Sequence, residues 1–190
     1  MIRSIVKVII IIGLFQGCFF YSMKGSLPVH IKSISLAPVV NESAEFAVAE
    51  ILNDELNELM LNENVLDIVM PEQADSRLEV VIVSVTDKPY TVSLSSALGM
   101  EEVEEWKLTI KTTVTWYDIK RDEVLLEKKM SSWGSYLPGV DISTDGIDND
   151  GDNLIDSEDS DETGSPRESA LNISVRRLTE DIVNEITNTW

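Results

Sequence analysis

The chain has 190 residues, which is enough for one domain of ordinary size with a single hydrophobic core. Its hydrophobic content of 43% is typical of a globular protein and excludes a disordered one. The formal net charge of -19 excludes a protein that binds nucleic acid through its phosphates, because such binding needs clustered lysine and arginine. Of the 34 acidic residues, ten lie between Asp141 and Glu162, where no basic residue occurs.

The N-terminus has the pattern of a lipoprotein signal peptide. Arg3 and Lys7 precede an apolar run from Val8 to Phe15, which is shorter than the roughly 20 residues that span a bilayer. Gln16-Gly17-Cys18 then resembles a lipobox, although Phe15 and Gln16 stand where leucine and a small residue are usual. This pattern predicts removal of residues 1–17 and acylation of Cys18, with chains such as palmitate. The alternative is an uncleaved membrane anchor with an incidental cysteine.

Acylation predicts a protein held at a membrane surface, because each buried methylene contributes about 0.8 kcal/mol. The residue after Cys18 is Phe19. In systems where an aspartate at that position signals retention in the inner membrane, Phe19 is compatible with export to the outer membrane.

The first half of the mature chain predicts strand, helix and strand. Residues 31–39 form a strand that Pro38 ends or places at an edge. Residues 44–60 form an amphipathic helix, because their apolar side chains recur at spacings of three and four, and Asn41-Glu42-Ser43 offers capping residues before it. The apolar positions are Val48, Ile51, Leu52, Leu56, Leu59 and Met60.

The second half predicts further strands and a final helix. Strands are expected at 65–70, 77–87, 106–119 and 124–133, with a loop or hairpin region at 89–100 and a polar turn at 118–123. The strand at 106–119 is the clearest, because its side chains alternate over ten residues. A second amphipathic helix is expected at 168–187, with its apolar stripe at Leu171, Val175, Leu178, Ile182 and Ile186.

Two helices with one apolar face each need a sheet to cover. The pattern therefore predicts an α+β two-layer sandwich, with two helices packed on a mixed or mostly antiparallel sheet of four to five strands. Residues 18–190 are expected to form one domain, with residues 141–165 as an inserted acidic loop.

Three segments resemble the LptE family. Residues 21–34 (YSMKGSLPVHIKSI), after Gly17-Cys18, resemble the start of its mature proteins. Residues 36–43 (LAPVVNES) resemble the passage from its first strand to its first helix, and residues 178–186 resemble its last helix. The likeness covers most of 17–140 and 166–190. It implies a lipoprotein on the periplasmic face of the outer membrane that plugs an LptD-like β-barrel and supports lipopolysaccharide transport.

The resemblance also implies contact with lipopolysaccharide through basic side chains. No motif in the sequence identifies which of its residues would make this contact. By chemistry alone the candidates are Lys107 and Lys111 on the polar face of one strand, and Lys128 and Lys129 on the next, because cations bind phosphate groups. The alternative for each lysine is a solvated strand face.

The acidic insert departs from the family pattern and resembles a calcium loop. Its candidate ligands match positions 1, 3, 5, 9 and 12 of an EF-hand loop, and are Asp148, Asp150, Asp152, Asp156 and Asp159. Asn153 stands where that loop has glycine, and no flanking helix is expected. The alternative is an open acidic loop without metal.

The sequence predicts a binding protein and no catalytic residues. His30 is the one histidine, and a histidine beside a strand is usually structural. We find no Ser-His-Asp set, phosphate-binding glycine loop or Cys/His cluster in the sequence. The competing interpretation is a calcium-binding envelope lipoprotein that acts as a scaffold or adhesion subunit.

Overall fold

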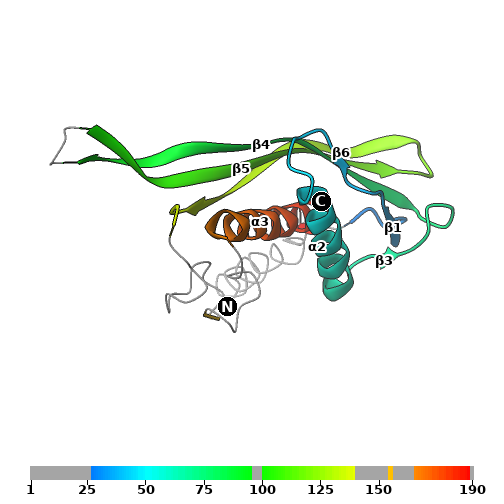
Figure 1. Cartoon of the computed structure of the whole chain (residues 1–190). Helices are drawn as coiled ribbons and strands as arrows, with labels where there is room; N and C mark the ends of the chain where they lie inside the picture. Colours follow the sequence, from blue (N-terminus) through cyan, green and yellow to red (C-terminus); the bar gives the residue numbers. More distant parts are fainter. Residues whose placement is uncertain (1–26, 96–99, 140–153, 156–164, 189–190) are drawn as a thin grey trace, which may run out of the picture.

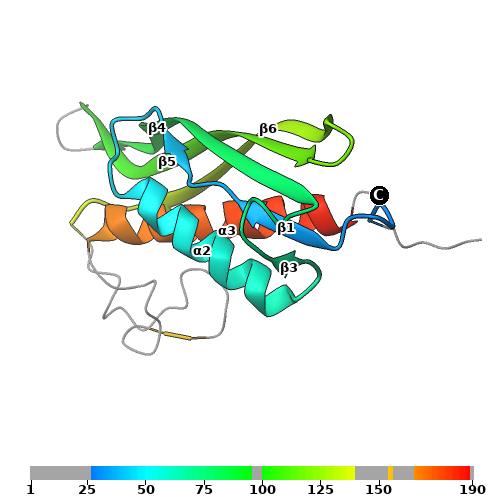
Figure 2. The same cartoon turned by 90° about the vertical axis from the view of Figure 1, so that its right-hand side faces the viewer.

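The computed structural model describes residues 27–95, 100–139, 154–155 and 165–188. These residues form one sheet with two helices on one of its faces (Figure 1; Figure 2). In chain order the elements are β1 (Ser33–Leu36), β2 (Val40–Asn41), α2 (Val48–Glu63), β3 (Asp67–Ile68), β4 (Ser76–Ser95), β5 (Met100–Asp118), β6 (Glu123–Tyr136) and α3 (Pro166–Asn188). The predicted α+β class, with two helices on a mixed sheet, is confirmed.

The sheet has the order β3-β1-β4-β5-β6, and β2 pairs with β4 beside β1. Strands β1, β2 and β3 run parallel to their neighbours, whereas β4, β5 and β6 form an antiparallel meander. The described residues thus form six strands, one more than the upper expected number. The additional strand is β2, which has two residues.

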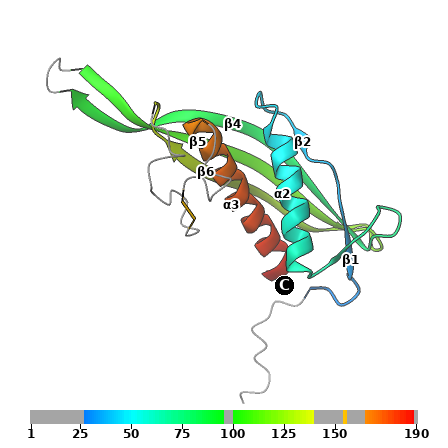
Figure 3. The same ribbon diagram turned by 60° about the horizontal axis from the view of Figure 1, so that its bottom comes forward.

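The core lies between the sheet and the helices, which cross the same face side by side (Figure 3). The alternation predicted for 106–119 is confirmed on this face, where Leu108, Ile110, Thr112, Val114 and Trp116 are buried. The stripe predicted for the last helix is also buried at all five positions. At about 1.5–3 kcal/mol for each large apolar side chain, this burial is what holds the two layers together.

A β-bulge in β4 reverses the facing of the residues that follow it. Ile82 pairs with Thr112, but Ser84 pairs with Lys111, so Val83 is an extra residue between them. Beyond the bulge Val85 and Asp87 therefore face the helices, and the alternate residues face away. This switch brings Asp87 to the start of α3.

The hairpin of β4 and β5 extends beyond the rest of the sheet and projects from it (Figure 1). The pairing of β5 with β6 ends at Trp106 and Tyr136, while the pairing of β5 with β4 continues to Met100 and Ser95. The expected hairpin at 89–100 is thus present, but most of that segment is strand. Register shifts around Thr91 accommodate Pro89 within the strand.

Helix α2 begins at Val48, later than predicted, and its N-cap Ala47 makes no side-chain capping hydrogen bond. The expected capping role of Asn41 and Ser43 is therefore wrong. The Asn41 carboxamide oxygen instead accepts a hydrogen bond from the Ser43 backbone N–H at 2.9 Å, so these side chains stabilise a turn before the helix. Within the described ranges, no helix has the length and apolar character needed to cross a membrane.

Candidate binding surface on the open face of the sheet

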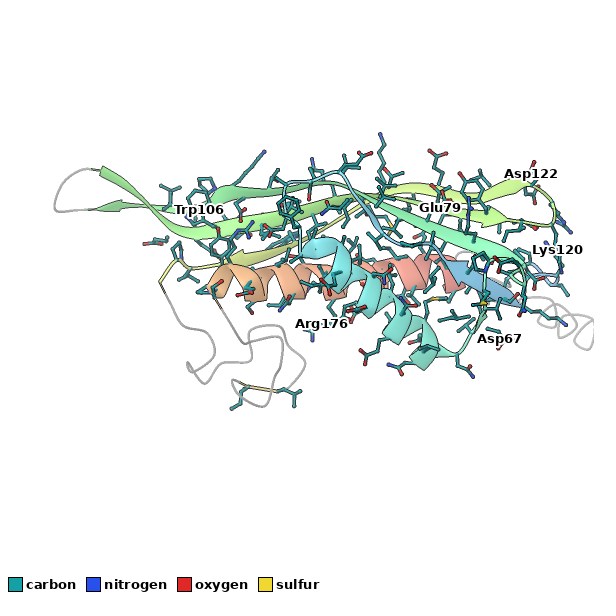
Figure 4. All side chains as sticks on the ribbon, turned by 45° about the vertical axis from the view of Figure 1, so that its right-hand side comes forward. Asp67, Glu79, Trp106, Lys120, Asp122 and Arg176 are labelled. Atoms are coloured by element: carbon teal, nitrogen blue, oxygen red, sulfur yellow. The ribbon has the colours of Figure 1, made fainter. Side chains whose placement is uncertain are left out.

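The face of the sheet away from the helices carries polar, basic and aromatic side chains. The register places the odd-numbered residues of β5 on this face, from Lys107 to Tyr117. On β4 it includes Glu79, which points to the helix-free side (Figure 4). On β5 the face extends from Lys107 to Tyr117, beside the turn that carries Lys120 and Asp122 (Figure 4).

Lys107 lies between two aromatic rings on this open face. Its Nζ is 3.9 Å from the centroid of the Trp133 ring and 5.3 Å from that of Tyr90. The two rings are 5.7 Å apart and tilted by 44°. Each such cation–π contact contributes about 0.5–1 kcal/mol at an exposed site. The ammonium group is therefore held in place between two flat apolar surfaces.

Lys111 and Lys129 lie one strand apart and line a common hollow of about 450 Å³ on the same face. Val83, the extra residue of the bulge, lines it with them, together with Thr113 and Ser131. Both lysines are exposed, and no ion pair to either is found within the described residues. The hollow thus combines two cationic groups with an apolar side chain.

Lys128 faces the opposite side of the sheet from the other three candidate lysines. It pairs with Val114 in the register, and its Nζ is 2.6 Å from Oε2 of Glu185 on α3. The structure therefore brings Lys107, Lys111 and Lys129 onto one face and separates Lys128 from them. The grouping of Lys128 with Lys129 on one face is wrong, because successive residues of a strand point to opposite faces.

Sequence reasoning missed Lys88, Tyr90, Trp133 and Val83 as members of this surface. Lys88 lies directly opposite Lys107 in the register and is exposed. The period-two pattern of the last long strand was a signal that placed Trp133 on the face of Lys129. No sequence signal was available for Val83, because its position depends on the bulge.

A polar cluster ties the start of the described chain to the far end of the sheet. His30 Nε2 is hydrogen-bonded to the buried carboxylate of Asp118, and Lys120 forms an ion pair with Asp75. Asp75 also accepts hydrogen bonds from the backbone N–H groups of Lys32, at 2.9 Å, and Ser33, at 3.2 Å. This confirms a structural role for His30.

Both carboxyl groups of this cluster have lowered pKa values. The hydrogen bond from Lys120 and that from the Lys32 N–H hold the pKa of Asp75 well below its ordinary value. For Asp118 burial raises the pKa, but hydrogen bonds from His30 and from the backbone N–H of Arg121 outweigh it, so the net pKa is lowered. Both groups are thus ionised and held in place at neutral pH.

A second cluster joins the end of β6 to the start of α3. Tyr136, the last residue of β6, donates a hydrogen bond to Oδ1 of Asp87 at 3.1 Å. Arg167, at the start of α3, donates to Oδ2 of Asp87 at 3.0 Å and to Oε2 of Glu45 at 2.8 Å. Hydrogen bonding to Asp87 raises the pKa of Arg167, and burial, with the hydrogen bond to Asp87, raises that of Tyr136.

Two sets of predicted site residues lie outside the described residues. These are the lipidation site and the calcium ligands, namely Cys18, Asp148, Asp150, Asp152, Asp156 and Asp159. Among the residues that are described, no group of three or more His, Cys, Asp or Glu side chains is arranged to hold a metal ion.

The fold and the surface define a class of protein, a two-layer α+β domain with one helix-covered sheet face and one open basic and aromatic face. The chain belongs to the LptE family, whose model, described as lipopolysaccharide-assembly, matches residues 31–189. No curated protein matches the chain.

Two solved structures have a similar fold. The hypothetical protein CT253 from Chlamydia trachomatis is 12% identical with a TM-score of 0.54, over 82% of this chain and 95% of that one. A neuraminyllactose-binding hemagglutinin homolog from Helicobacter pylori is 15% identical with a TM-score of 0.53, over 89% of this chain and 93% of that one. At these identities the likeness shows the fold alone.

Proposed function

We propose that the chain is an outer-membrane lipoprotein that acts in lipopolysaccharide transport as the plug of an LptD-like β-barrel. In this proposal acyl chains on Cys18 hold it at the periplasmic face, and it works by binding and not by catalysis. The observation that carries the proposal is the match of the LptE family model to residues 31–189. The pattern of residues 1–18, with a basic start, an apolar run and Gly17-Cys18, supports the anchor.

The open face of the sheet is the proposed contact for lipopolysaccharide. That ligand combines phosphate groups with acyl chains, so a matching surface needs cations next to apolar side chains. Lys111 and Lys129 beside Val83 supply this combination, and Lys107 between Tyr90 and Trp133 supplies it again further along the same face. Lys128 is left out of this proposal because it pairs with Glu185.

Co-purification tests the proposed partner. The full-length chain with a C-terminal affinity tag is extracted from envelopes in mild detergent, and its companions are identified by mass spectrometry. We expect a large β-barrel protein in stoichiometric amount. Recovery of the acylated chain without a barrel overturns the role as a plug. Mass measurement of the N-terminal peptide tests the anchor separately, because acylation adds the mass of its fatty chains to Cys18.

Two neighbouring lysines provide a matched test of the ligand-binding face. Lys129→Glu and Lys128→Glu change the net charge equally, but the first residue faces the open side and the second faces α3. With purified lipopolysaccharide as the probe, we expect Lys129→Glu to weaken binding at least tenfold, about 1.4 kcal/mol, and Lys128→Glu to change it less than twofold. Equal losses in the two variants contradict the assignment of this face.

A second proposed function is that of a calcium-binding envelope scaffold or adhesion subunit. The spacing of the five aspartates from Asp148 to Asp159, with interposed Gly, Asn and Ile, favours it. The two proposals are compatible, because the insert lies between β6 and α3 in the chain and includes none of the lysines proposed to contact lipopolysaccharide. Calorimetric titration with calcium tests the second proposal, and an absence of heat at millimolar metal contradicts it.

A further inference from the structure

One end of the sheet is where the described chain enters the domain. The register places the starts of β1, β3, β4 and β6 and the last residue of β5 at this end. Helix α2 also ends here, because residues 64–66 connect it directly to β3. Asp67, Lys120 and Asp122 lie at this end, well separated from Trp106 (Figure 4). We call it the entry end and define it by residues 27–32, 61–67 and 119–124.

Apolar side chains are exposed around the entry end. Val29, in the turn before β1, is 91% exposed, and Leu61, in the last turn of α2, is 64% exposed. Val65, between α2 and β3, and Ile119, after β5, are also exposed. These residues come from separate segments, so the fold and not one local run of sequence collects them at this end. Their exposure favours contact with an apolar medium.

The length of chain before Leu27 indicates which medium this is. Residues 18–26 connect the proposed acylated Cys18 to Leu27 and can span at most about 30 Å. Leu27 packs against the core, and His30 is hydrogen-bonded to Asp118, so the start of the described chain is fixed to the entry end. The lipid that holds the acyl chains is therefore within reach of this end of the domain.

A short tether makes even a weak contact effective. When one contact is already made, a second that is joined to it by a short linker forms at an effective concentration on the order of millimolar. Removing apolar surface from water contributes about 25 cal/mol per Å². Partial burial of Val29 and Leu61 among lipid headgroups is thus sufficient to orient a domain that its acyl chains already hold at the membrane.

The charges at the entry end indicate the kind of lipid surface. Within its three ranges the exposed basic residues are matched by exposed acidic ones; the basic residues are Lys32, Lys120 and Arg121, and the acidic ones are Glu63, Asp67, Asp122 and Glu123. The entry end therefore has no excess of positive charge to attract it to anionic lipids. A zwitterionic surface fits it better, and contact should depend on apolar side chains and little on salt.

We propose that the entry end rests on the zwitterionic lipid surface into which the acyl chains of Cys18 insert, with Val29, Leu61 and Val65 among the headgroups. This inference rests on the proposed function, because it needs the acylated cysteine. It also gives the domain an orientation. The projecting hairpin of β4 and β5 lies at the opposite end of the sheet, so it is directed away from that lipid surface (Figure 1).

Quenching of a fluorescent label by lipid tests the contact. Cys18 is the one cysteine, and acylation blocks its thiol, so the cysteine of a Leu61→Cys variant can be labelled selectively. Phe46→Cys is the matched control, because Phe46 is 90% exposed just before the other end of α2. The acylated chain, expressed at full length, is reconstituted in phosphatidylethanolamine and phosphatidylcholine vesicles with nitroxide-labelled headgroups. We expect about threefold stronger quenching at position 61 than at position 46, and no loss of it at high salt.

A label at a second position shows whether the native side chains make the contact. With the dye on Val65→Cys, adding Leu61→Glu should reduce quenching about threefold, and adding Phe46→Glu should leave it unchanged. Equal quenching at positions 46 and 61 overturns the inference while the anchor stands. So does protection of position 61 that requires the barrel protein, or that increases with protein concentration, without quenching by lipid. If mass measurement finds Cys18 unacylated, both the inference and the proposed anchor are overturned.

Discussion

His30 is hydrogen-bonded through Nε2 to the buried carboxylate of Asp118, although 88 residues separate them in the sequence. The contact joins the segment just before β1 to the last residue of β5. Because the Asp118 side chain is fully buried, its charge depends on these hydrogen-bond donors. The start of the described chain is thus attached to the sheet at a fixed point.

We expect His30→Ala to lower the free energy of unfolding by about 1–3 kcal/mol, because it leaves a buried carboxylate with fewer donors. The measurement is urea denaturation at pH 7 of the chain without residues 1–17. Lys88→Ala, an exposed lysine on the open face, is the control and should change stability by less than about 0.5 kcal/mol. If His30→Ala changes the free energy of unfolding no more than Lys88→Ala does, the structural role of His30 is contradicted.

The lowered pKa values of Asp75 and Asp118 predict loss of stability in acid. A carboxyl whose folded pKa lies below its unfolded value stabilises the fold above the unfolded pKa, about 4. That stabilisation is lost as the pH falls through the folded pKa. Between pH 6 and pH 2 the free energy of unfolding should decline less in Asp75→Asn than in the original chain. Parallel curves for the two proteins argue against the lowered pKa of Asp75.

Gly134 of β6 lies directly beneath α3. A Cβ built at this position comes 2.5 Å from the backbone carbonyl oxygen of Ala170. Since neither atom belongs to a flexible side chain, Gly134→Ala must displace the helix. We expect a loss of about 1–3 kcal/mol in the free energy of unfolding, the usual range for overpacking. Ser131→Ala, three residues earlier on the exposed part of β6, should leave the midpoint of denaturation nearly unchanged.

Arg167 and Tyr136 bind different oxygens of Asp87, so the two contacts can be removed separately. Tyr136→Phe should lower the free energy of unfolding by about 1 kcal/mol, the usual value for one neutral hydrogen bond. Arg167→Ala should cost more, about 2 kcal/mol, because it removes charge-assisted bonds to both Asp87 and Glu45. Chemical denaturation of both variants checks the order, and a larger effect of Tyr136→Phe contradicts it.

The proposed calcium loop predicts a metal-dependent gain in stability. If calcium binds the folded chain, saturating metal at a hundredfold excess over Kd raises the unfolding free energy by about 2.7 kcal/mol. Asp150→Asn with Asp152→Asn should abolish both this gain and the heat of calcium titration. Magnesium at the same concentration serves as the control ion, and an equal effect of magnesium indicates general screening of the acidic residues.

Much of the fold was predictable because periodic patterns are local. The alternation from Leu108 to Trp116 and the stripe from Leu171 to Ile186 identify the faces that become buried. Strict alternation also separates Lys128 from Lys129, and the error there came from treating both as one polar face. The local sequence therefore contained the information that was missed.

Other features depend on contacts between distant residues and were not predictable. The bulge at Val83 turns Asp87 towards α3, and nothing in residues 77–87 marks its position. The contact of Asp87 with Arg167 spans 80 residues. The extension of β4 through Pro89 was missed because proline usually ends a strand, whereas here register shifts accommodate it.

The anchorage of Tyr136 and Arg167 on a single carboxylate has a practical consequence for protein engineering. Any peptide inserted between these two residues begins and ends next to side chains whose positions are already fixed by hydrogen bonds to Asp87. Doubling the length of such a graft adds only about 0.6 kcal/mol of closure entropy. This junction is therefore suited to the insertion of epitopes or fluorescent reporters, and to shortening of the natural segment.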